Sequence, residues 1–192
     1  MRGPNSLLIG LDEVGRGSWA GPLVVAAVIL KDEINGLNDS KVLSFKKRAQ
    51  LDTLIRSKTN LIAVSEISAK IIDKIGLTKA ISLAMESAVQ DLKGQDYNKI
   101  IIDGNYNFLQ NLDNVETLIK ADAKVPTVMA ASIIAKVYRD NLMIKLSSTY
   151  PEYGFESNFG YGTKKHIDAL KKYGPTPIHR LSYKPVKVLS NR

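Results

Sequence analysis

The chain has 192 residues, 44% of them hydrophobic and 24% charged, and this composition is typical of one globular domain and excludes a disordered protein. Its 27 Lys and Arg outnumber its 19 Asp and Glu, and the net charge of +8 suggests a polyanionic partner, although many basic proteins bind none. Cysteine is absent, which excludes disulfides and thiolate zinc sites, and no apolar run approaches the ~18 residues of a membrane span, so we expect a cytoplasmic protein without a membrane contact.

The first third of the chain predicts three strands and a helix. Leu7–Leu11 is a short apolar strand, and the β-prone run Leu23–Leu30 predicts a buried one. Ser44 is a typical helix N-cap, and apolar residues at helical spacing follow it from Leu51. A third strand is predicted at Leu61–Ile67.

The rest of the chain alternates between helices and strands and then becomes rich in glycine, proline and aromatic residues from Tyr150. The predicted elements are a helix at Leu77–Lys93, strands at Lys99–Asp103 and Glu116–Lys120, and helices at Thr127–Ser147 and Thr163–Tyr173. This order indicates an α/β sheet that helices cover on both faces. We expect one domain over residues 1–192, with an extension of helices and loops over about 150–192.

Acidic residues stand at the ends of three predicted strands. Asp12 and Glu13 end the first strand, Asp103 ends another, and Asp122 follows a third. Ligand sites of open α/β sheets form where strands end together, and four bare carboxylates there would repel one another. Two divalent cations would remove that repulsion, and hard oxygen ligands favour Mg²⁺ or Mn²⁺ over zinc. Each acid alone is better explained as a turn residue, so only their joint placement favours a metal site.

The glycine-rich loop after the first strand has a competing interpretation. Gly15-Arg16-Gly17, together with Ala20, matches a dinucleotide-binding fingerprint. Asp32 and Glu33 would then contact the ribose. The fingerprint requires a helix that opens at its second glycine and holds the pyrophosphate. Gly21-Pro22 interrupts any such helix and a strand-like run follows, so we do not favour this function.

Several segments, taken in order, resemble the ribonuclease HII family. They are Asp12-Glu13-Val14-Gly15-Arg16-Gly17 with Ala20-Gly21-Pro22, Asp39-Ser40-Lys41, Ile102-Asp103-Gly104-Asn105, Asp122-Ala123-Lys124 followed by Ala130–Lys136, Gly160-Tyr161-Gly162-Thr163 with His166, and Gly174–Arg180. Each segment alone is weak, but the ordered set is specific and covers nearly the whole chain. Departures from the family pattern are Ser18-Trp19, Ala121 and Phe159, none of which is a presumed ligand.

This resemblance implies a ribonuclease-H-like fold, with a mixed central sheet flanked by helices and a small C-terminal helical extension. It implies a catalytic domain that hydrolyses the RNA strand of RNA–DNA hybrids and incises duplex DNA 5′ of single ribonucleotides, leaving 3′-hydroxyl and 5′-phosphate ends. The four strand-end acids fall on the family's catalytic acids, Asp12, Glu13, Asp103 and Asp122. Gly15-Arg16-Gly17 falls on its ribonucleotide-sensing loop and Tyr161 on its junction-reading tyrosine.

The acids would hold two divalent ions, and we expect Asp12 to bridge both while the other three complete the ligand shells. Adjacent residues of a strand point to opposite faces, so Asp12 and Glu13 can share one site only where the strand breaks. Gly15 and Gly17 are consistent with such a break. For Tyr161, a packed aromatic side chain explains the spacing equally well.

Several lysines are candidate substrate ligands. Lys41 belongs to one of the family segments, and the last predicted helix carries two pairs at i,i+7 spacing, Lys164 with Lys171 and Lys165 with Lys172. Each pair lies on one helical face, and for a polyanionic substrate phosphate contacts are favoured over a solvated lysine face. The two histidines, His166 and His179, lack metal-ligand spacing and are expected to be structural.

Two alternatives from the residues stay open. A non-catalytic module that binds RNA–DNA hybrids would share the fold, although a binder does not need four converging carboxylates. A ribonuclease HIII-like enzyme would prefer longer ribonucleotide runs and carries an extra N-terminal domain, whereas 11 residues precede Asp12 here. The tail Val186–Arg192 shows no sliding-clamp motif. We expect a monomer, and no obligate protein partner is evident.

Overall fold

The computed structural model describes residues 7–38, 40–59 and 61–190. Asp39, from the predicted Asp39-Ser40-Lys41 segment, and the last two residues of the tail lie outside the described residues. The chain forms two compact units: Met1–Val14, Val24–Ser65 and Ile81–Val137 make the first, and Gly15–Leu23, Glu66–Ala80 and Tyr138–Arg192 make the second. The prediction of a single domain with an extension stays a prediction.

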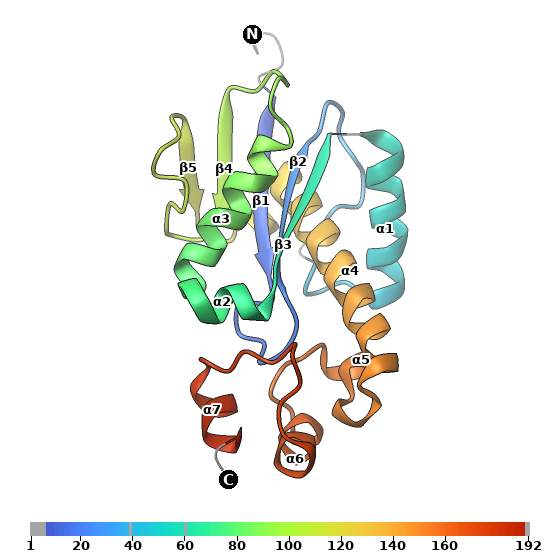
Figure 1. Cartoon of the computed structure of the whole chain (residues 1–192). Helices are drawn as coiled ribbons and strands as arrows, with labels where there is room; N and C mark the ends of the chain where they lie inside the picture. The colour runs from blue at the N-terminus through green and yellow to red at the C-terminus, as the bar shows by residue number, and fades with distance from the viewer. Residues whose placement is uncertain (1–6, 39, 60, 191–192) are drawn as a thin grey trace, which may run out of the picture. The chain divides into compact units, whose positions relative to one another are not determined.

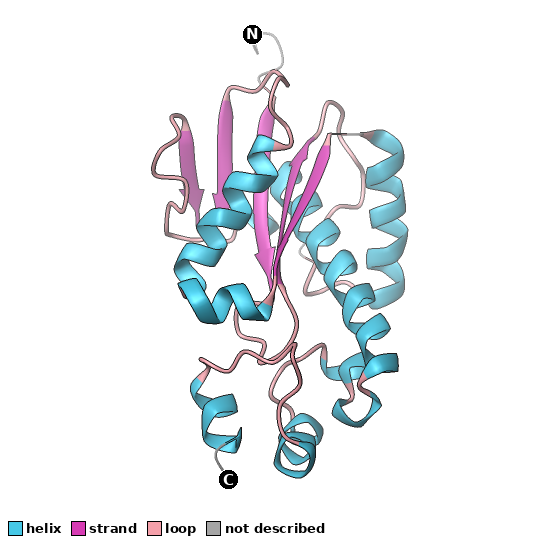
Figure 2. Ribbon diagram, in the orientation of Figure 1, coloured by secondary structure: helices cyan, strands magenta, loops and turns pink. Residues whose placement is uncertain are grey.

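A five-stranded sheet carries the predicted strands (Figures 1 and 2). Its spatial order is β3 (Ile62–Ile67), β2 (Leu23–Ile29), β1 (Leu8–Val14), β4 (Lys99–Asp103) and β5 (Val115–Leu118). β1 pairs antiparallel with β2 and parallel with β4, and β4 pairs parallel with β5. The sheet is therefore mixed, as predicted, and β1, β4 and β5 end at the same edge.

All seven residues of β2 are buried, so both faces of this strand are covered. Val24, Ala26 and Val28 pack in one cluster with the apolar residues of α1 (Phe45–Lys58) and α4 (Pro126–Thr149). Complete burial of one such aliphatic side chain stabilises the fold by roughly 1.5–3 kcal/mol. Figure 1 shows α3 (Leu77–Gln90) on the other side of the sheet from α4, which agrees with the predicted layers.

The start of α4 packs directly on β1, two residues before Asp12. A Cβ atom at Gly10 would lie 2.3 Å from the carbonyl carbon of Thr127 and 2.5 Å from the amide nitrogen of Val128. Only glycine allows this approach, because any side chain would meet backbone atoms that cannot move independently. The helix is therefore held against the strand that carries Asp12.

One boundary error concerns β1, which was predicted to end at Leu11. The strand continues to Val14, and its antiparallel pairing with β2 includes Asp12 opposite Ala26 and Val14 opposite Val24. Regular pairing with β2 extends past both acids, so the strand does not break at Asp12 and Glu13 but ends at Val14, directly before Gly15.

Other boundaries shift by a few residues for local reasons. β5 ends at Leu118, before Lys120, whose φ of 59° places it in the left-handed region. α3 ends at Gln90, and a turn leads from it to Gly94, whose φ is +90°. The predicted N-cap of α1 is confirmed, since the Ser44 side chain accepts a hydrogen bond from an amide of the first turn.

The second unit contains short helices, most of which were not predicted. They are α2 (Ala69–Ile75), the 3₁₀ helix η2 (Pro151–Tyr153), α5 (Phe155–Asn158) and α7 (Lys184–Ser190). The predicted helix from Thr163 is confirmed as α6 (Lys164–Tyr173), with the Thr163 side chain as its N-cap. Within the described part of the chain, no helix is both long and apolar enough to cross a membrane.

Candidate active site

Three of the four predicted acids converge at the edge where β1, β4 and β5 end. Ligand oxygens of Asp12, Asp103 and Asp122 all lie within 4.8 Å of one another. Asp12 and Asp103 come from adjacent parallel strands in which Leu11 lies opposite Ile102. Asp122 is on the 3₁₀ helix η1, Ala121–Ala123, which follows β5.

Asp103 holds the turn that carries Asp122. Its Oδ1 atom accepts hydrogen bonds from the backbone N–H of Ala121 at 2.7 Å and of Asp122 at 3.4 Å. The left-handed residue Lys120 turns the chain so that both amides face this carboxylate. The relative position of two acids is therefore set by backbone hydrogen bonds as well as by the strands.

The environment of Asp12 disfavours its negative charge. Burial, and then the neighbouring carboxylates of Glu13 and Asp103, raise the pKa of Asp12 to about 8. Hydrogen bonds from the Ser132 hydroxyl and from the Glu13 backbone N–H, the latter 2.8 Å from Asp12 Oδ1, act in the opposite direction. A bound divalent cation would favour the ionised carboxylate, so the cluster suits such an ion.

The predicted Ser40-Lys41 segment lies beside these acids. Lys41 Nζ donates to Asp122 Oδ2 at 2.5 Å, although most of the lysine side chain is exposed. The hydroxyls of Ser40 and Ser132 are 2.8 Å apart, and Ser132 in turn hydrogen-bonds Asp12. Lys41 was predicted to bind substrate, and the structure places its ammonium group on an acid of the cluster.

Glu13, the fourth predicted ligand, is not in this group of three. Its carboxylate is close enough to raise the pKa of Asp12. The three clustered acids supply hard oxygen donors with two buried members, which fits a divalent cation such as Mg²⁺ or Mn²⁺. Participation of Glu13 in such a site stays a prediction.

In the second unit, the buried Arg139 holds the loop that contains Gly15-Arg16-Gly17. Its guanidinium donates to the carbonyls of Pro22, Phe159 and Ala20 and to the Ser18 hydroxyl, at 2.7–3.1 Å. Ser18 in turn donates to the Gly15 carbonyl at 2.9 Å. Burial lowers the pKa of Arg139 to about 10, so the group stays charged at neutral pH.

A second buried arginine supports the same loop. Arg180 donates to the Arg16 carbonyl at 3.0 Å and to the Gly21 carbonyl at 3.1 and 3.2 Å. The Tyr183 hydroxyl adds a 2.6 Å hydrogen bond to the Arg16 carbonyl. Both arginines are fully buried and bind backbone carbonyls, so they act as rigid supports for the loop.

Tyr161 lies next to the predicted sensing loop. A Cβ atom at Gly17 would be 3.9 Å from Cε1 of the Tyr161 ring, and the Arg139 guanidinium lies 5.7 Å from the centre of that ring. The Gly160 carbonyl accepts hydrogen bonds from the amides of Trp19 at 2.8 Å and Ala20 at 3.3 Å. The structure therefore brings the loop and Tyr161 together, and Tyr161 is 37% exposed.

The glycines on both sides of Tyr161 are required by this packing. A Cβ at Gly160 would lie 2.3 Å from the Ala20 carbonyl oxygen, and one at Gly162 would lie 2.2 Å from the Trp19 indole. Trp19, one of the departures from the family pattern, therefore contacts the Tyr161 turn directly.

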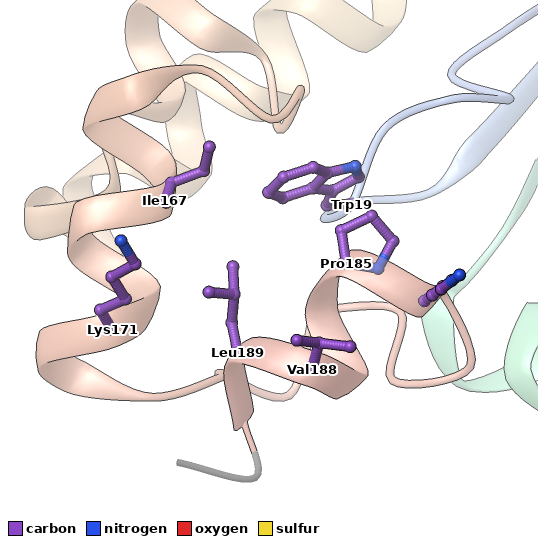
Figure 3. Close-up of a pocket in the computed structure, with 7 residues that line it drawn as sticks. Trp19, Ile167, Lys171, Pro185, Val188 and Leu189 are labelled. Carbon is purple, nitrogen blue, oxygen red and sulfur yellow. The ribbon is translucent and has the colours of Figure 1, made fainter.

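The lysines of α6 are exposed as predicted, but they do not form one uniform face. Lys164, Lys165 and Lys172 line one hollow. Lys171 and Ile167 line another of about 460 Å³ beside Trp19 (Figure 3). Lys165 also pairs with Glu156 at 3.1 Å, and Lys172 lies over the Tyr173 ring. The four lysines are therefore not equivalent candidates for phosphate contacts.

The dinucleotide-binding alternative does not fit this geometry. The fingerprint requires a helix that opens at Gly17, but the chain forms a turn there and continues into β2. Sequence patterns also missed four supporting residues, Ser40, Ser132, Arg139 and Arg180. A signal was present for Ser40, Ser132 and Arg180, since all three stand within segments that resemble the family, but nothing local marked Arg139 as a loop support.

Comparisons with known proteins agree with this geometry. A family model described as Ribonuclease HII matches residues 9–186. The Ribonuclease HII of Sulfurovum sp. (strain NBC37-1) is 48% identical over 184 residues, which are 96% of this chain and 95% of that protein.

Solved structures show the same fold. The ribonuclease H2 of Pyrococcus horikoshii OT3 is 29% identical and gives a TM-score of 0.79 over 97% of this chain and 98% of that one. The RNase HII of Archaeoglobus fulgidus, solved in a complex with PCNA, is 28% identical and gives a TM-score of 0.80 over 93% and 95% of the two chains. The predicted ribonuclease-H-like fold is confirmed.

Proposed function

This chain belongs to the ribonuclease HII family, and from that premise we propose that it incises duplex DNA on the 5′ side of a single embedded ribonucleotide by a two-metal-ion mechanism. As a member of the family it is a metal-dependent endoribonuclease that acts on RNA–DNA hybrids. The observation that carries the proposal is the convergence of Asp12, Asp103 and Asp122 within 4.8 Å. The expected products carry 3′-hydroxyl and 5′-phosphate ends.

The acids would hold the metals at the strand edge. Asp12, Asp103 and Asp122 would hold the ions, and Glu13 would contribute from beside Asp12. Two bound divalent ions supply a water of lowered pKa and stabilise the leaving oxygen. The Ser132 hydroxyl orients the Asp12 carboxylate, and the amides of η1 orient that of Asp103.

The loop Gly15-Arg16-Gly17 and Tyr161 would select the substrate. The loop backbone can donate to and accept from a 2′-hydroxyl, the group that distinguishes RNA from DNA locally. The exposed ring of Tyr161 beside Gly17 would pack against the next sugar. A second 2′-hydroxyl at that sugar would crowd the ring, so the pair would recognise the junction from RNA to DNA.

The decisive experiment is incubation with a duplex that contains one ribonucleotide, with Mg²⁺ or Mn²⁺ or with a chelator, followed by mapping of the cut. We expect one metal-dependent incision 5′ of the ribonucleotide. Binding without any cleavage would favour the hybrid-binding module, and cleavage restricted to longer ribonucleotide runs would favour a ribonuclease HIII-like enzyme.

Tyr161→Ala is expected to reduce cleavage at a single ribonucleotide by at least about tenfold more than cleavage within a continuous RNA–DNA hybrid, a loss of about 1.4 kcal/mol in selectivity. Only the first substrate presents the junction that the ring would contact. Tyr161→Phe should keep most activity if the ring carries the recognition. Rates of all three proteins on both substrates test this, and an equal loss on both substrates for Tyr161→Ala would make Tyr161 a packing residue.

Neutralising the α6 lysines is expected to weaken binding of all duplexes alike. The variant changes Lys164, Lys165, Lys171 and Lys172 to Gln. The slope of log affinity against log salt should flatten by about 0.9 for each phosphate that the protein no longer neutralises. Duplex titrations at several salt concentrations measure this slope. A control with the same charge change at the exposed residues Lys46, Lys47, Lys58 and Lys93 separates local contacts from net charge, and equal slopes for both variants would contradict phosphate binding by α6.

A further inference from the structure

The two histidines of the chain form a buried pair beneath Tyr161, within the second unit. His166 Nε2 and His179 Nε2 are 3.0 Å apart, and neither residue is more than 2% exposed. The rings of Trp19, Tyr153 and Phe155 surround the pair. A contact between two like nitrogens is favourable only if one is protonated and the other is not.

The hydrogen bonds of His179 show which of its ring nitrogens carries the proton. The backbone N–H of Thr176 donates to His179 Nδ1 at 2.9 Å, and the Thr176 hydroxyl lies 2.8 Å from the same nitrogen. His179 Nδ1 therefore carries no proton. In the neutral ring the proton is on Nε2, which must donate to His166 Nε2.

The contact between His166 and the Tyr161 carbonyl independently gives the same donor and acceptor for the hydrogen bond between the two histidines. His166 Nδ1 lies 3.0 Å from the Tyr161 carbonyl oxygen, which can only accept, so Nδ1 carries the proton of His166. His166 Nε2 is then the acceptor that His179 requires. Burial lowers the pKa of both histidines, that of His179 to about 4, which agrees with two neutral rings.

The hydrogen-bonded pair of histidines joins the Tyr161 turn to the backbone that supports the sensing loop. His179 forms an antiparallel bridge with Ala20, and the adjacent Arg180 amide donates to the Trp19 carbonyl at 2.8 Å. The Arg180 side chain binds the Arg16 carbonyl, as described above. The hydrogen bonds of the imidazoles therefore run from the Tyr161 carbonyl through His166 and His179 to Thr176. The backbone of His179 and Arg180 pairs with the segment that follows the loop.

We propose that His166 and His179 are positioning residues, whose single proton order, from Thr176 through His179 and His166 to the Tyr161 carbonyl, fixes the Tyr161 ring relative to the Gly15-Arg16-Gly17 loop. This proposal rests on the proposed role of Tyr161 in junction recognition. The histidines touch no reacting atom in this scheme, and they act on selectivity between substrates through the backbone of Tyr161.

The first test reads the tautomers directly and does not depend on activity. Because the chain has two histidines, ¹⁵N-histidine labelling gives four ring nitrogens, and long-range ¹H–¹⁵N spectra at neutral pH separate protonated from unprotonated ones. We expect one ring protonated at Nδ1 and the other at Nε2, with the His166→Asn spectrum identifying the remaining ring as His179. Two rings with the same tautomer, or a protonated His179 Nδ1, would overturn the proposal.

The second test uses two variants of one residue as matched controls. His166→Asn places an amide N–H near the position of Nδ1 and can still donate to the Tyr161 carbonyl. His166→Gln places its carboxamide near Nε2, which keeps a partner for His179 but leaves the Tyr161 carbonyl without this donor. The rate ratio between single-ribonucleotide duplex and continuous hybrid should stay within about threefold of wild type for His166→Asn and fall by about tenfold for His166→Gln.

An identical ratio for both variants would mean that the pair supports packing alone, and would overturn the proposal. Fluorescence of Trp19, the one tryptophan of the chain, reports whether each variant folds, and a variant that does not fold leaves the decision to the wild-type tautomers. If wild-type protein failed to incise at a single ribonucleotide, the proposed function would be contradicted. The spectra would still show which ring nitrogens of the two histidines carry protons.

Discussion

Asp12→Asn is expected to reduce the rate of RNA hydrolysis by at least about a thousandfold, equivalent to roughly 4 kcal/mol of transition-state stabilisation. The substitution removes the charge that we propose to bridge two ions while it keeps the size of the side chain. Single-turnover cleavage of a continuous hybrid at saturating Mg²⁺ measures this loss. Binding of the uncleaved duplex should be retained, because the loop and Tyr161 are unchanged.

The same substitution should stabilise the metal-free protein at alkaline pH. The pKa of Asp12 rises on folding from 3.8 to about 8, so the folded state binds this proton more tightly than the unfolded state. As the pH rises from about 4 to about 8, this carboxyl therefore destabilises the folded state by an increasing amount. At pH 8 with a chelator, Asp12→Asn should unfold at a higher temperature than wild type, and added Mg²⁺ should raise the melting temperature of wild type more than that of the variant.

A matched control changes another acid of the first unit in the same way. Asp91 lies on an exposed turn after α3. Asp91→Asn should therefore alter neither the cleavage rate nor the response of the melting temperature to Mg²⁺. Cleavage by Asp12→Asn at a rate within about tenfold of wild type would contradict the two-ion assignment.

Arg139→Lys is expected to destabilise the fold by about 3–5 kcal/mol, the loss typical of a broken buried network around a charge. Four hydrogen bonds from the planar guanidinium reach the Ser18 hydroxyl and the carbonyls of Ala20, Pro22 and Phe159. An ammonium group has three donors and a shorter reach, so at least one buried acceptor loses its partner. A melting temperature lower by roughly 10 °C would correspond to this loss.

Arg56→Lys provides the control for this change of side chain. Arg56 is exposed on α1 and pairs with Asp52 at i,i+4 spacing, so its replacement should change the free energy of unfolding by less than about 0.5 kcal/mol. Urea unfolding followed by circular dichroism compares the two variants. Equal stabilities of Arg139→Lys and wild type would mean that the loop does not depend on the guanidinium.

The positions of the strand-end acids could be predicted from the sequence because they follow local patterns. A buried β-prone run that ends in Asp103, and another followed by Asp122, identify two strand ends without any long-range information. Ligand sites of open α/β sheets form where strands end together, so convergence with Asp12 was expected, and the parallel pairing of β1, β4 and β5 provides it. The sequence by itself therefore determined the α/β class and the strand-end acids, of which three cluster in the structure.

Where a predicted boundary was wrong, pairing between strands had overridden the local signal. The apolar run suggested that β1 ends at Leu11, but pairing with the antiparallel partner β2 continues the strand to Val14. α2, at Ala69–Ile75, was missed because it is a single short helix, although Ser68 caps its start and Gly76 ends it. Short elements of this kind depend on tertiary packing more than on their own propensity.

Only the tertiary structure decided which polar side chains support the site. Arg139 meets Ser18 across 121 residues of sequence, and both are buried because backbone carbonyls from the loop satisfy the guanidinium. His166 and His179 give no local sign of their contact, and their proton order follows only from the donors and acceptors at the two ends. Such hydrogen bonds depend on backbone directions that long-range packing sets, and no local residue pattern encodes those directions.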